Sequence, residues 1–462
     1  TQLLLVKLHI QIQEYIQRNE SRCILLSATP YNKTYLDLSS QLRLFMPEDA
    51  DLGIRPERLL REIGEVEFST RHQAPLRSLQ AFEKSEYPDD WRELMRLFMV
   101  RRTRSFIRDN YAETDSKNGR KYLVYPDGGR DYFPARRPKR ATFKLDENNP
   151  DDQYARLYRE DVVNTINDLN LPRYGLGNHI NEKETPTAKE KSILNDLSRG
   201  GRRLMGFCRT NLFKRLESSG IAFLLSVERH ILRNYVFIHA LENNLPVPIG
   251  TQGAEMLDTQ FEDGDADAVL YNSARLFDDA TVELESDETD TVDAPLHSEE
   301  AFKKRASEIY SLYDGRFQRR FKWLRPELFQ KKLTGKLRED AENLLLILQV
   351  CGEWQPDKDT KLKKIYNLIT EEYPDEKILV FSQFADTVNY LESQLKDLEV
   401  DKLSGVTGGS ADPTEMAWRF SPVSNEKREE ISAEDELRVL ISTDVLSEGQ
   451  NLQDSHIVVN YD

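Results

Sequence analysis

The sequence predicts an α/β protein with a parallel sheet near each end of the chain and a large helical region between them. Short apolar runs followed by polar residues are typical of buried parallel strands, and four occur, at Cys23–Leu26, Ile378–Phe381, Val439–Ile441 and Ile457–Val459. Segments with apolar residues at helical spacing separate them. Residues 153–250 and 301–350 keep this helical spacing, so we expect a helical insertion there.

Composition excludes several classes of protein. At roughly 150 residues per domain, 462 residues correspond to two to four domains. Mean hydropathy is −0.64, and no apolar run approaches the roughly 18 residues of a membrane span. The apolar start Leu3–Leu8 contains Lys7 and lacks a small-residue cleavage site, which argues against a signal peptide. Three widely spaced cysteines exclude a disulfide scaffold and a cysteine zinc site. We expect a cytoplasmic protein with no membrane partner.

The net charge of −16 does not argue against a nucleic-acid partner, because the acid is concentrated in one block. Residues 251–300 contain sixteen acidic residues and one basic residue, Arg275, so the rest of the chain is close to neutral. Binding depends on the local field rather than on the whole-chain charge. The block is most simply a solvated loop, and mimicry of DNA or capture of a basic partner is the alternative.

The first part of the chain mixes both element types. The predicted elements are a helix at Ile10–Ile16, the strand at Cys23–Leu26, a helix at Tyr35–Phe45, proline-interrupted helices from Pro47 to Tyr87, a helix at Trp91–Val100, and turns with short strands over 115–140. A basic run, Arg101, Arg102, Arg104 and Arg108, follows the helix at Trp91–Val100 directly.

The middle is predicted to be helical, with a break at Pro172, Gly175 and Gly177. The basic run from Arg199 to Arg215 predicts a stripe for the DNA backbone, a brace against the α/β domains, or a solvated helix face. A basic helix at Lys303–Arg338 carries interleaved aromatic residues, for which core packing is favoured over base stacking. The last hundred residues then alternate a helix at Lys361–Thr370, a strand, a helix containing Val388 to Leu398, and two further strands.

Polar side chains follow three of the apolar strands, where the carboxyl ends of strands in doubly wound sheets form the ligand crevice. Ser27, Ala28 and Thr29 follow the first strand, and the alternative to a role in ligand binding is a purely structural turn capped by a hydroxyl group. Ser382 and Gln383 follow the second and could donate to a phosphate or a base edge, or simply cap the next helix. The third segment, Val439–Asp462, is the most specific. In it, Thr443 can bind a backbone phosphate, Gly449 permits close backbone approach, and Asn451 can reach a sugar hydroxyl.

Taken in this order, the three segments resemble motifs III, IV and V of superfamily-two helicases, specifically the Swi/Snf-type DNA translocases. Further similarities are the segment Phe98–Arg104, which looks like the basic end of the first motor lobe, Tyr132-Phe133-Pro134 with Gln153 to Tyr158, and Thr360-Lys361-Leu362 at the start of the second lobe. The strings Ser447–Asn451 and Asn211–Gly220 resemble bacterial members that recycle RNA polymerase. The resemblance implies tandem RecA-like lobes, the first partial and the second nearly complete.

The resemblance also implies roles for individual residues. Ser27, Ala28 and Thr29 would couple nucleotide state to DNA contact. DNA-backbone contact is implied for Ser382, Gln383, Thr443, Arg101, Arg102 and Arg104. A position beside ATP is implied for Glu448, Gly449, Gln450 and Asn451, although Glu448 stands where many relatives carry arginine. The implied cofactors are ATP and Mg²⁺, and the implied partner is double-stranded DNA.

Three motifs that phosphoryl transfer needs do not occur in the sequence. There is no G-x-x-x-x-G-K-[ST] phosphate loop, no Asp-Glu-x-His box after a strand, and no Q-x-x-G-R-x-x-R motif. The chain therefore looks like the middle of a motor, and we expect it to hydrolyse ATP poorly or not at all on its own. The expected parts are residues 1–145 as the end of a first lobe, 146–355 as the helical insertion with the acidic loop 251–300, and 356–462 as the second lobe.

Two other classes of function stay open. One is a non-catalytic nucleic-acid-binding or assembly module, and the other is an α/β transferase with a nucleotide-sugar fold. The transferase leaves the basic run at Arg101–Arg104 without a role. The process served by a motor is also open, with RNA polymerase and defence or restriction proteins as the candidate partners.

Overall fold

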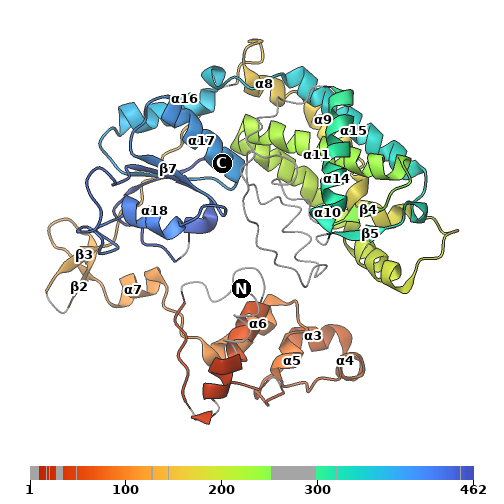
Figure 1. The fold of residues 1–462 in the computed structure, drawn as a ribbon. Helices are drawn as coiled ribbons and strands as arrows, with labels where there is room; N and C mark the ends of the chain where they lie inside the picture. The colour runs from red at the N-terminus through yellow and green to blue at the C-terminus, as the bar shows by residue number, and fades with distance from the viewer. Residues whose placement is uncertain are drawn as a thin grey trace. The chain divides into compact units, whose positions relative to one another are not determined.

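In a computed structural model the chain forms two compact units, residues 1–139 and 140–462 (Figure 1). The described residues are 10–16, 18–19, 21–27, 35–47, 49–125, 128–143, 145–250, 298–318, 321–447 and 449–462. Within that set, the side chains of residues 192 and 195–204 are left out. Ala28, Thr29, Glu448 and nearly all of the acidic block lie outside the described residues.

The first unit begins with small helices packed around a few large side chains. Residues 10–16 are helical, and the next helices are α2 (Leu36–Leu42), α3 (Glu57–Ile63), α4 (Glu65–His72), α5 (Leu79–Phe82) and α6 (Pro88–Phe98). Trp91 of α6 is fully buried and packs with Leu38, Leu79 and Phe82. The carboxylate of Asp90 accepts the backbone N–H groups of Arg58 and Leu59, 2.7 and 3.1 Å away, and so holds the first turn of α3.

The strand predicted at Cys23–Leu26 is wrong. Residues 21–27 have no regular secondary structure, and the side chains of Ile24 and Leu26 are 84% and 92% exposed. A parallel strand is stable only when neighbouring strands take up its backbone hydrogen bonds. No strand among the described residues of this unit pairs with residues 21–27, so the apolar run has no sheet to join.

The end of the first unit is a small, exposed and basic substructure, which we call the basic module (residues 104–139). It contains α7 (Arg104–Asn110) and an antiparallel sheet of β1 (Glu113–Thr114), β2 (Lys121–Val124) and β3 (Arg130–Tyr132). This confirms the turns and short strands predicted over 115–140.

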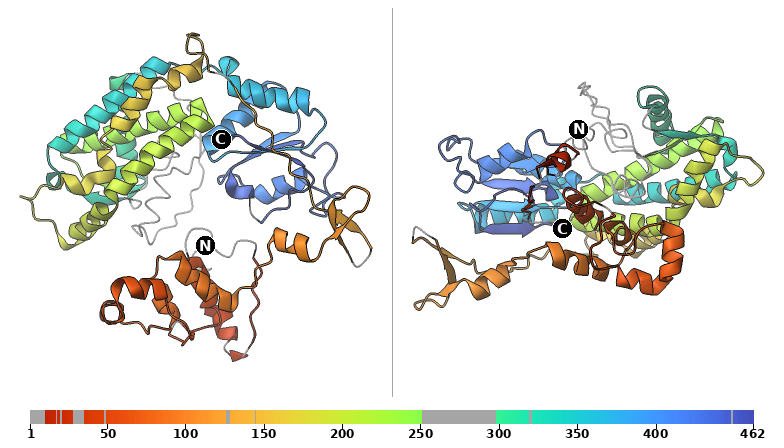
Figure 2. Two further views of the ribbon diagram at one scale, coloured as in Figure 1. Left: turned by 180° about the vertical axis from the view of Figure 1, so that it is seen from behind. Right: turned by 90° about the horizontal axis from the view of Figure 1, so that it is seen from below.

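The second unit starts with a helical region built around α11, which is buried on nearly all sides. Helix α11 packs against α10, α14 and α15 (Figure 2). The predicted break at Pro172 is the 3₁₀ segment η1 (Pro172–His179). The elements are α8 (Gln153–Leu157), α9 (Glu160–Asp168), η1, α10 (Ala188–Ser218), α11 (Gly220–Glu242), β4 (Val247–Ile249), α14 (Glu299–Asp314), β5 (Lys322–Leu324), η3 (Pro326–Leu328) and α15 (Lys332–Cys351).

The single basic helix predicted at Lys303–Arg338 is also wrong. Helix α14 ends before Gly315, the strand β5 pairs antiparallel with β4, and α15 begins only at Lys332. The run contains a strand because β4 offers it a partner. The prediction that its aromatic residues pack in the core is confirmed for Tyr310, Tyr313 and Phe321, which are all buried.

Residues 360–462 form an α/β domain with four parallel strands in the order β7-β8-β6-β9. Three of these strands match the predicted apolar runs, and the coarse prediction of an α/β class is confirmed. The strand β7 and helix α18 were not predicted. The elements are η4 (Pro356–Lys358) before the domain, α16 (Thr360–Asn367), the π-helical turn η5 (Leu368–Glu372), β6 (Ile378–Phe381), α17 (Ala385–Asp397), β7 (Leu403–Val406), α18 (Pro413–Phe420), β8 (Val439–Ser442), η6 (Asp444–Leu446) and β9 (Ile457–Asn460).

Alternate side chains of the strands bury against the two faces of this sheet. Ile378, Val380 and Val439 pack against α16 and α17, whereas Leu379 and Leu440 pack against α18 and η6. The sheet therefore lies between two helical layers, as Figure 1 shows. No helix in the described part of the chain combines the length and apolarity needed to cross a membrane.

Candidate functional site

The carboxyl ends of β6, β8 and β9 open onto a pocket of about 770 Å³, which we call the strand-end pocket. Helix α10 forms the opposite wall. Ligands of open α/β sheets bind outside the carboxyl ends of the strands, so this is the expected place for a site. The lining residues are Phe207, Thr210, Asn211, Lys214 and Arg215 of α10, Phe381 to Phe384, Asp444, Ser447, Asn460 and Asp462.

Three residues of this domain, Ser382, Gln383 and Thr443, are predicted to contact the DNA backbone, and they differ in their exposure and in whether they line the pocket. The side chain of Gln383 is exposed and lines it. Ser382 also lines it but is buried, and its hydroxyl donates to Asp462 over 2.8 Å. Thr443 is buried beside β7, where its backbone N–H donates to the carbonyl of Val406, and it does not line the pocket. Gln383 is thus the best placed of the three to reach a ligand.

Asp462 organises the inner rim of the strand-end pocket. Its carboxylate accepts hydrogen bonds from the hydroxyls of Ser218 and Ser382, at 2.5 and 2.8 Å, and from the backbone N–H of Gln383. Ser218 also lies 2.8 Å from the hydroxyl of Thr387. This network ties the end of α10 to the start of α17, so it holds the wall and the rim of the pocket together.

A buried ion cluster continues this connection, and sequence reasoning missed it. Arg229 of α11 binds Asp386 of α17 through both guanidinium Nη atoms, at 2.6 and 2.9 Å, and Arg215 of α10 adds a contact of 3.1 Å. The side chain of Asp386 is 0% exposed, and those of Arg215 and Arg229 are 3% and 5% exposed. The Arg215 guanidinium also lies over the Phe384 ring. We call this cluster, with the Ser218 network, the seam.

For one residue of the basic run from Arg199 to Arg215, the seam decides between the predicted roles. Arg215 braces α10 against the α/β domain rather than facing solvent. A signal for the seam was present in the sequence, because Arg229 interrupts a strongly apolar helix. A buried arginine in such a helix requires a carboxylate partner.

Lys361 contacts the seam at the last carbonyls of α10. Its ammonium group donates to the carbonyls of Glu217 and Ser218, at 2.7 and 2.6 Å, and lies 4.1 Å from the centre of the Tyr461 ring. A cation is favourable at these carbonyls because they end α10 and carry its negative dipole. Burial nevertheless lowers the pKa of Lys361 to about 8, against the opposing effect of Asp462, Asp359 and Glu217.

Of the predicted nucleotide-side residues after β8, the three that the structure describes, Gly449, Gln450 and Asn451, are not part of the lining of the strand-end pocket. Gly449 has a φ of +72°, which L side chains rarely adopt, so a glycine is needed there. The side-chain amide of Gln450 donates to Thr414, and that of Asn451 donates to the carbonyl of Ser424 over 2.6 Å. Their role beside ATP stays a prediction.

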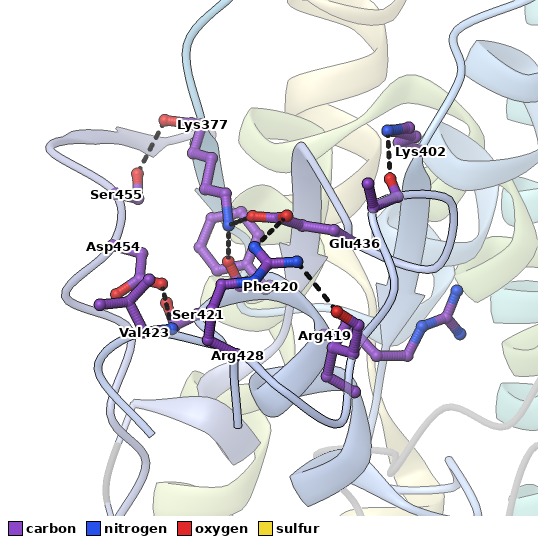
Figure 3. Close-up of polar contacts among 12 residues, drawn as sticks. Lys377, Lys402, Arg419, Phe420, Ser421, Val423, Arg428, Glu436, Asp454 and Ser455 are labelled. Carbon is purple, nitrogen blue, oxygen red and sulfur yellow. Dashed lines mark hydrogen bonds and ion pairs between the residues drawn. The ribbon is translucent and has the colours of Figure 1, made fainter. Parts of the chain in front are cut away.

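Asn451 donates to the segment between α18 and β8, and polar contacts with other parts of the domain hold this segment in place (Figure 3). The carboxylate of Asp454 accepts the backbone N–H groups of Val423 and Ser424, both at 2.8 Å. Farther along, Glu436 pairs with Lys377 at 2.6 Å and with Arg428 at 2.5 Å. These contacts anchor both ends of the segment on the domain, and they fix the loop against which Asn451 lies.

Of the predicted residues of the first unit, the structure describes Ser27, Arg101, Arg102 and Arg104, and Ser27 is not part of the lining of the pocket to which Arg104 belongs. Ser27 is exposed in the irregular segment 21–27. Arg101, Arg102 and Arg104 are exposed, with Arg102 lying over the Phe106 ring and Arg104 lining a pocket of the basic module. Among the described residues of both units, no His, Cys, Asp or Glu side chains converge as metal ligands would.

The comparison with protein families gives a match for the α/β domain just described. Residues 360–462 match the family described as the helicase conserved C-terminal domain. The chain is helicase-like. The helicase C-terminal domain has the RecA-like α/β fold, in agreement with the parallel sheet β7-β8-β6-β9. No curated protein matches the chain.

Proposed function

We propose that the chain is part of an ATP-dependent DNA translocase of the Swi/Snf type, whose two RecA-like lobes move along double-stranded DNA. The observation that carries the proposal is the helicase C-terminal domain, with a pocket at the carboxyl ends of β6, β8 and β9 whose lining includes Lys214 and Gln383. The bacterial group, a cytoplasmic location, and RNA polymerase or defence and restriction proteins as partners belong to the same proposal.

The strand-end pocket supplies the groups that a nucleic-acid backbone needs. The ammonium group of Lys214 and the side chain of Gln383 are both exposed and both line the pocket. Lysine neutralises a phosphate, and the glutamine amide donates a hydrogen bond to its oxygen. Arg215 binds Asp386, so among the described side chains of α10 in the pocket lining Lys214 is the cation placed to meet a ligand. The hydroxyls of Thr210 and Ser447 and the amides of Asn211 and Asn460 add further polar contacts.

ATP and Mg²⁺ belong to the proposal for the intact protein. The described residues contain no cluster of carboxylates arranged for a metal, and the amides of Gln450 and Asn451 already bind Thr414 and Ser424. These residues do not by themselves build a nucleotide and metal site, so we derive no step through ATP. What the chain supplies is the DNA side of the motor.

The same observation favours a second candidate, a non-catalytic nucleic-acid-binding or assembly module. Both candidates predict that the chain binds duplex DNA. They differ in whether a nucleotide changes that binding, because only a motor couples the two.

The test is duplex binding, measured by fluorescence anisotropy with a labelled 20-base-pair DNA at several salt concentrations. We expect Lys214→Gln to weaken binding severalfold and to lower the salt slope by about one. Gln383→Ala should weaken binding by a similar factor with the slope unchanged. Lys189→Gln, which removes an exposed lysine at the start of the same helix, is the matched control.

Three outcomes decide the proposal. Failure of the wild-type chain to bind duplex at low salt would contradict both candidates. An affinity for duplex that changes when ATP is added favours the motor over the passive module. Duplex-stimulated ATP hydrolysis by this chain alone would contradict the expectation drawn from the missing motifs.

A further inference from the structure

A second, smaller pocket of about 360 Å³ lies within the basic module. One wall comes from α7, and the other comes from the extended chain that follows β3. The lining residues are Arg104, Ser105, Arg108, Phe133, Pro134 and Arg136. We call it the arginine pocket. Three cations and a hydroxyl surround it, and no acidic residue is part of its lining.

We infer that the arginine pocket binds a backbone phosphate of nucleic acid. Arg104 and Arg108 are four residues apart, so their side chains lie on one face of α7. Arg136 approaches from the opposite wall. Three guanidinium groups around one cavity repel one another unless an anion lies between them. The planar donor fork of arginine fits phosphate oxygens better than the point charge of lysine does.

The described carboxylates of the module are not part of the lining of the arginine pocket, and each has a partner of its own, which for Asp131 is the hydroxyl of Tyr125. Glu113 accepts the hydroxyl of Tyr122 over 2.8 Å, and Asp115 accepts that of Tyr132 over 2.6 Å. Asp109 pairs at the surface with Arg108 at 3.2 Å and with Lys121 at 3.5 Å. Within the described part of the chain, Arg104 and Arg136 make no ion pair. Two of the three pocket cations are therefore available to a ligand.

The surroundings favour a polymeric anion over a free one. Three further exposed arginines, Arg101, Arg102 and Arg137, lie within a few residues of Arg104 or Arg136 in the sequence. Residues 133–143 contain no acidic residue. A row of cations neutralises several phosphates of one strand, whereas an inorganic ion needs one site. Phe133 and Pro134 give the pocket an apolar side, against which a sugar can pack. The inference rests on the proposed function, because it adds a second contact point for the same nucleic acid.

A substitution of Ser105 tests the pocket without threatening the fold. Ser105→Asp adds a negative charge inside the pocket and lies in the first turn of α7, where a carboxylate stabilises a helix. Ser116→Asp adds the same charge to an exposed turn of the same module, outside the pocket, and is the matched control. Arg136→Gln removes one pocket cation that has no ion-pair partner. Circular dichroism checks that each variant is folded.

We expect Ser105→Asp to weaken duplex binding by the full-length chain on the order of tenfold, with Arg136→Gln lowering the salt slope by about one. Ser116→Asp should change the affinity much less. Equal affinities for Ser105→Asp and Ser116→Asp, with duplex still bound by the wild type, would overturn the inference and leave the proposed function intact. Absence of duplex binding by the wild type would overturn both.

A competition arm separates the two sources of phosphate. Inorganic phosphate at millimolar concentration should displace duplex only as far as the same ionic strength of chloride does. Displacement beyond that level, lost in Ser105→Asp, would assign the pocket to a free phosphate compound and overturn the nucleic-acid assignment.

Discussion

The seam of the second unit and the basic module of the first both depend on arginines, but in opposite states. Arg215 and Arg229 are buried, and both bind the carboxylate of Asp386. Arg104 and Arg136 are exposed and line a pocket without an acidic residue. A buried arginine whose charge is satisfied inside the protein holds elements together, whereas an exposed one without an ion pair is available to a ligand. The number of arginines in a segment therefore says less than where the matching carboxylates lie.

The largest effect should come from breaking the seam. Asp386→Asn removes the buried carboxylate that both Arg215 and Arg229 bind, and we expect the free energy of unfolding to fall by about 3–5 kcal/mol. Urea unfolding followed by tryptophan fluorescence measures it. The matched control is Asp109→Asn in the basic module, which removes exposed ion pairs only and should leave the unfolding midpoint unchanged. Equal midpoints for the two variants would contradict the comparison.

A smaller effect should come from the apolar packing beside the seam. A Cβ atom on Gly220, the first residue of α11, would overlap the indole ring of Trp354. We expect Gly220→Ala to lower the free energy of unfolding by about 1–3 kcal/mol. Gly206→Ala is the control, because a Cβ atom there meets nothing within 4 Å and alanine favours the interior of α10. It should stabilise by about 0.5–1 kcal/mol. The same sign for both variants would show that Trp354 yields to the added methyl group.

A third effect sharpens the comparison through pH. The pKa of Lys361 is about 8 in the folded chain, below its ordinary value of 10.5, so between these values the unfolded chain binds the proton more strongly. The contribution of Lys361 to the free energy of unfolding therefore rises with pH from about 8 to 10.5, by at most about 1.4 kcal/mol per pH unit.

Lys361→Gln removes this slope, so the difference in unfolding free energy between the wild type and the variant should change across that window and stay constant from pH 6 to 7. Urea unfolding at pH 6, 7, 8.5 and 9.5 measures the difference. A constant difference over the whole series would place the ammonium group in water instead of at the end of α10.

The fold of the helicase C-terminal domain was predictable where a short apolar run in the sequence marks a buried strand. The strands β6, β8 and β9 are apolar runs, and each was predicted to within a residue. The strand β7 was missed because its sequence, Leu-Ser-Gly-Val, is short and half polar. The run at Cys23–Leu26 has the right composition for a strand but pairs with no strand in the part of the chain that the structure describes. Apolar composition fixes a strand only where a neighbouring strand is present.

The candidate site was predictable in its location but not in its construction. The rule about strand carboxyl ends places Gln383 at a pocket. It gives no sign of the opposite wall, because Arg215 and Asp386 are 171 residues apart in sequence. The arginine pocket could not be predicted for the same reason. Arg104 precedes the sheet β1-β2-β3 in the sequence and Arg136 follows it, and strands this short have no recognisable alternation of apolar and polar residues.

The strand order β7-β8-β6-β9 has a consequence for synthesis of the chain. Strand β6 is hydrogen-bonded on one side to β8 and on the other to β9, which follow it by about 60 and about 80 residues. At a translation rate of roughly 5–20 residues per second, the apolar β6 is synthesised about 4–16 s before β9. During that interval it is an unprotected edge that another nascent chain could pair with. A ribosome that stalls between residues 382 and 438 would therefore release a product prone to aggregation, because neither neighbour of β6 has yet been synthesised.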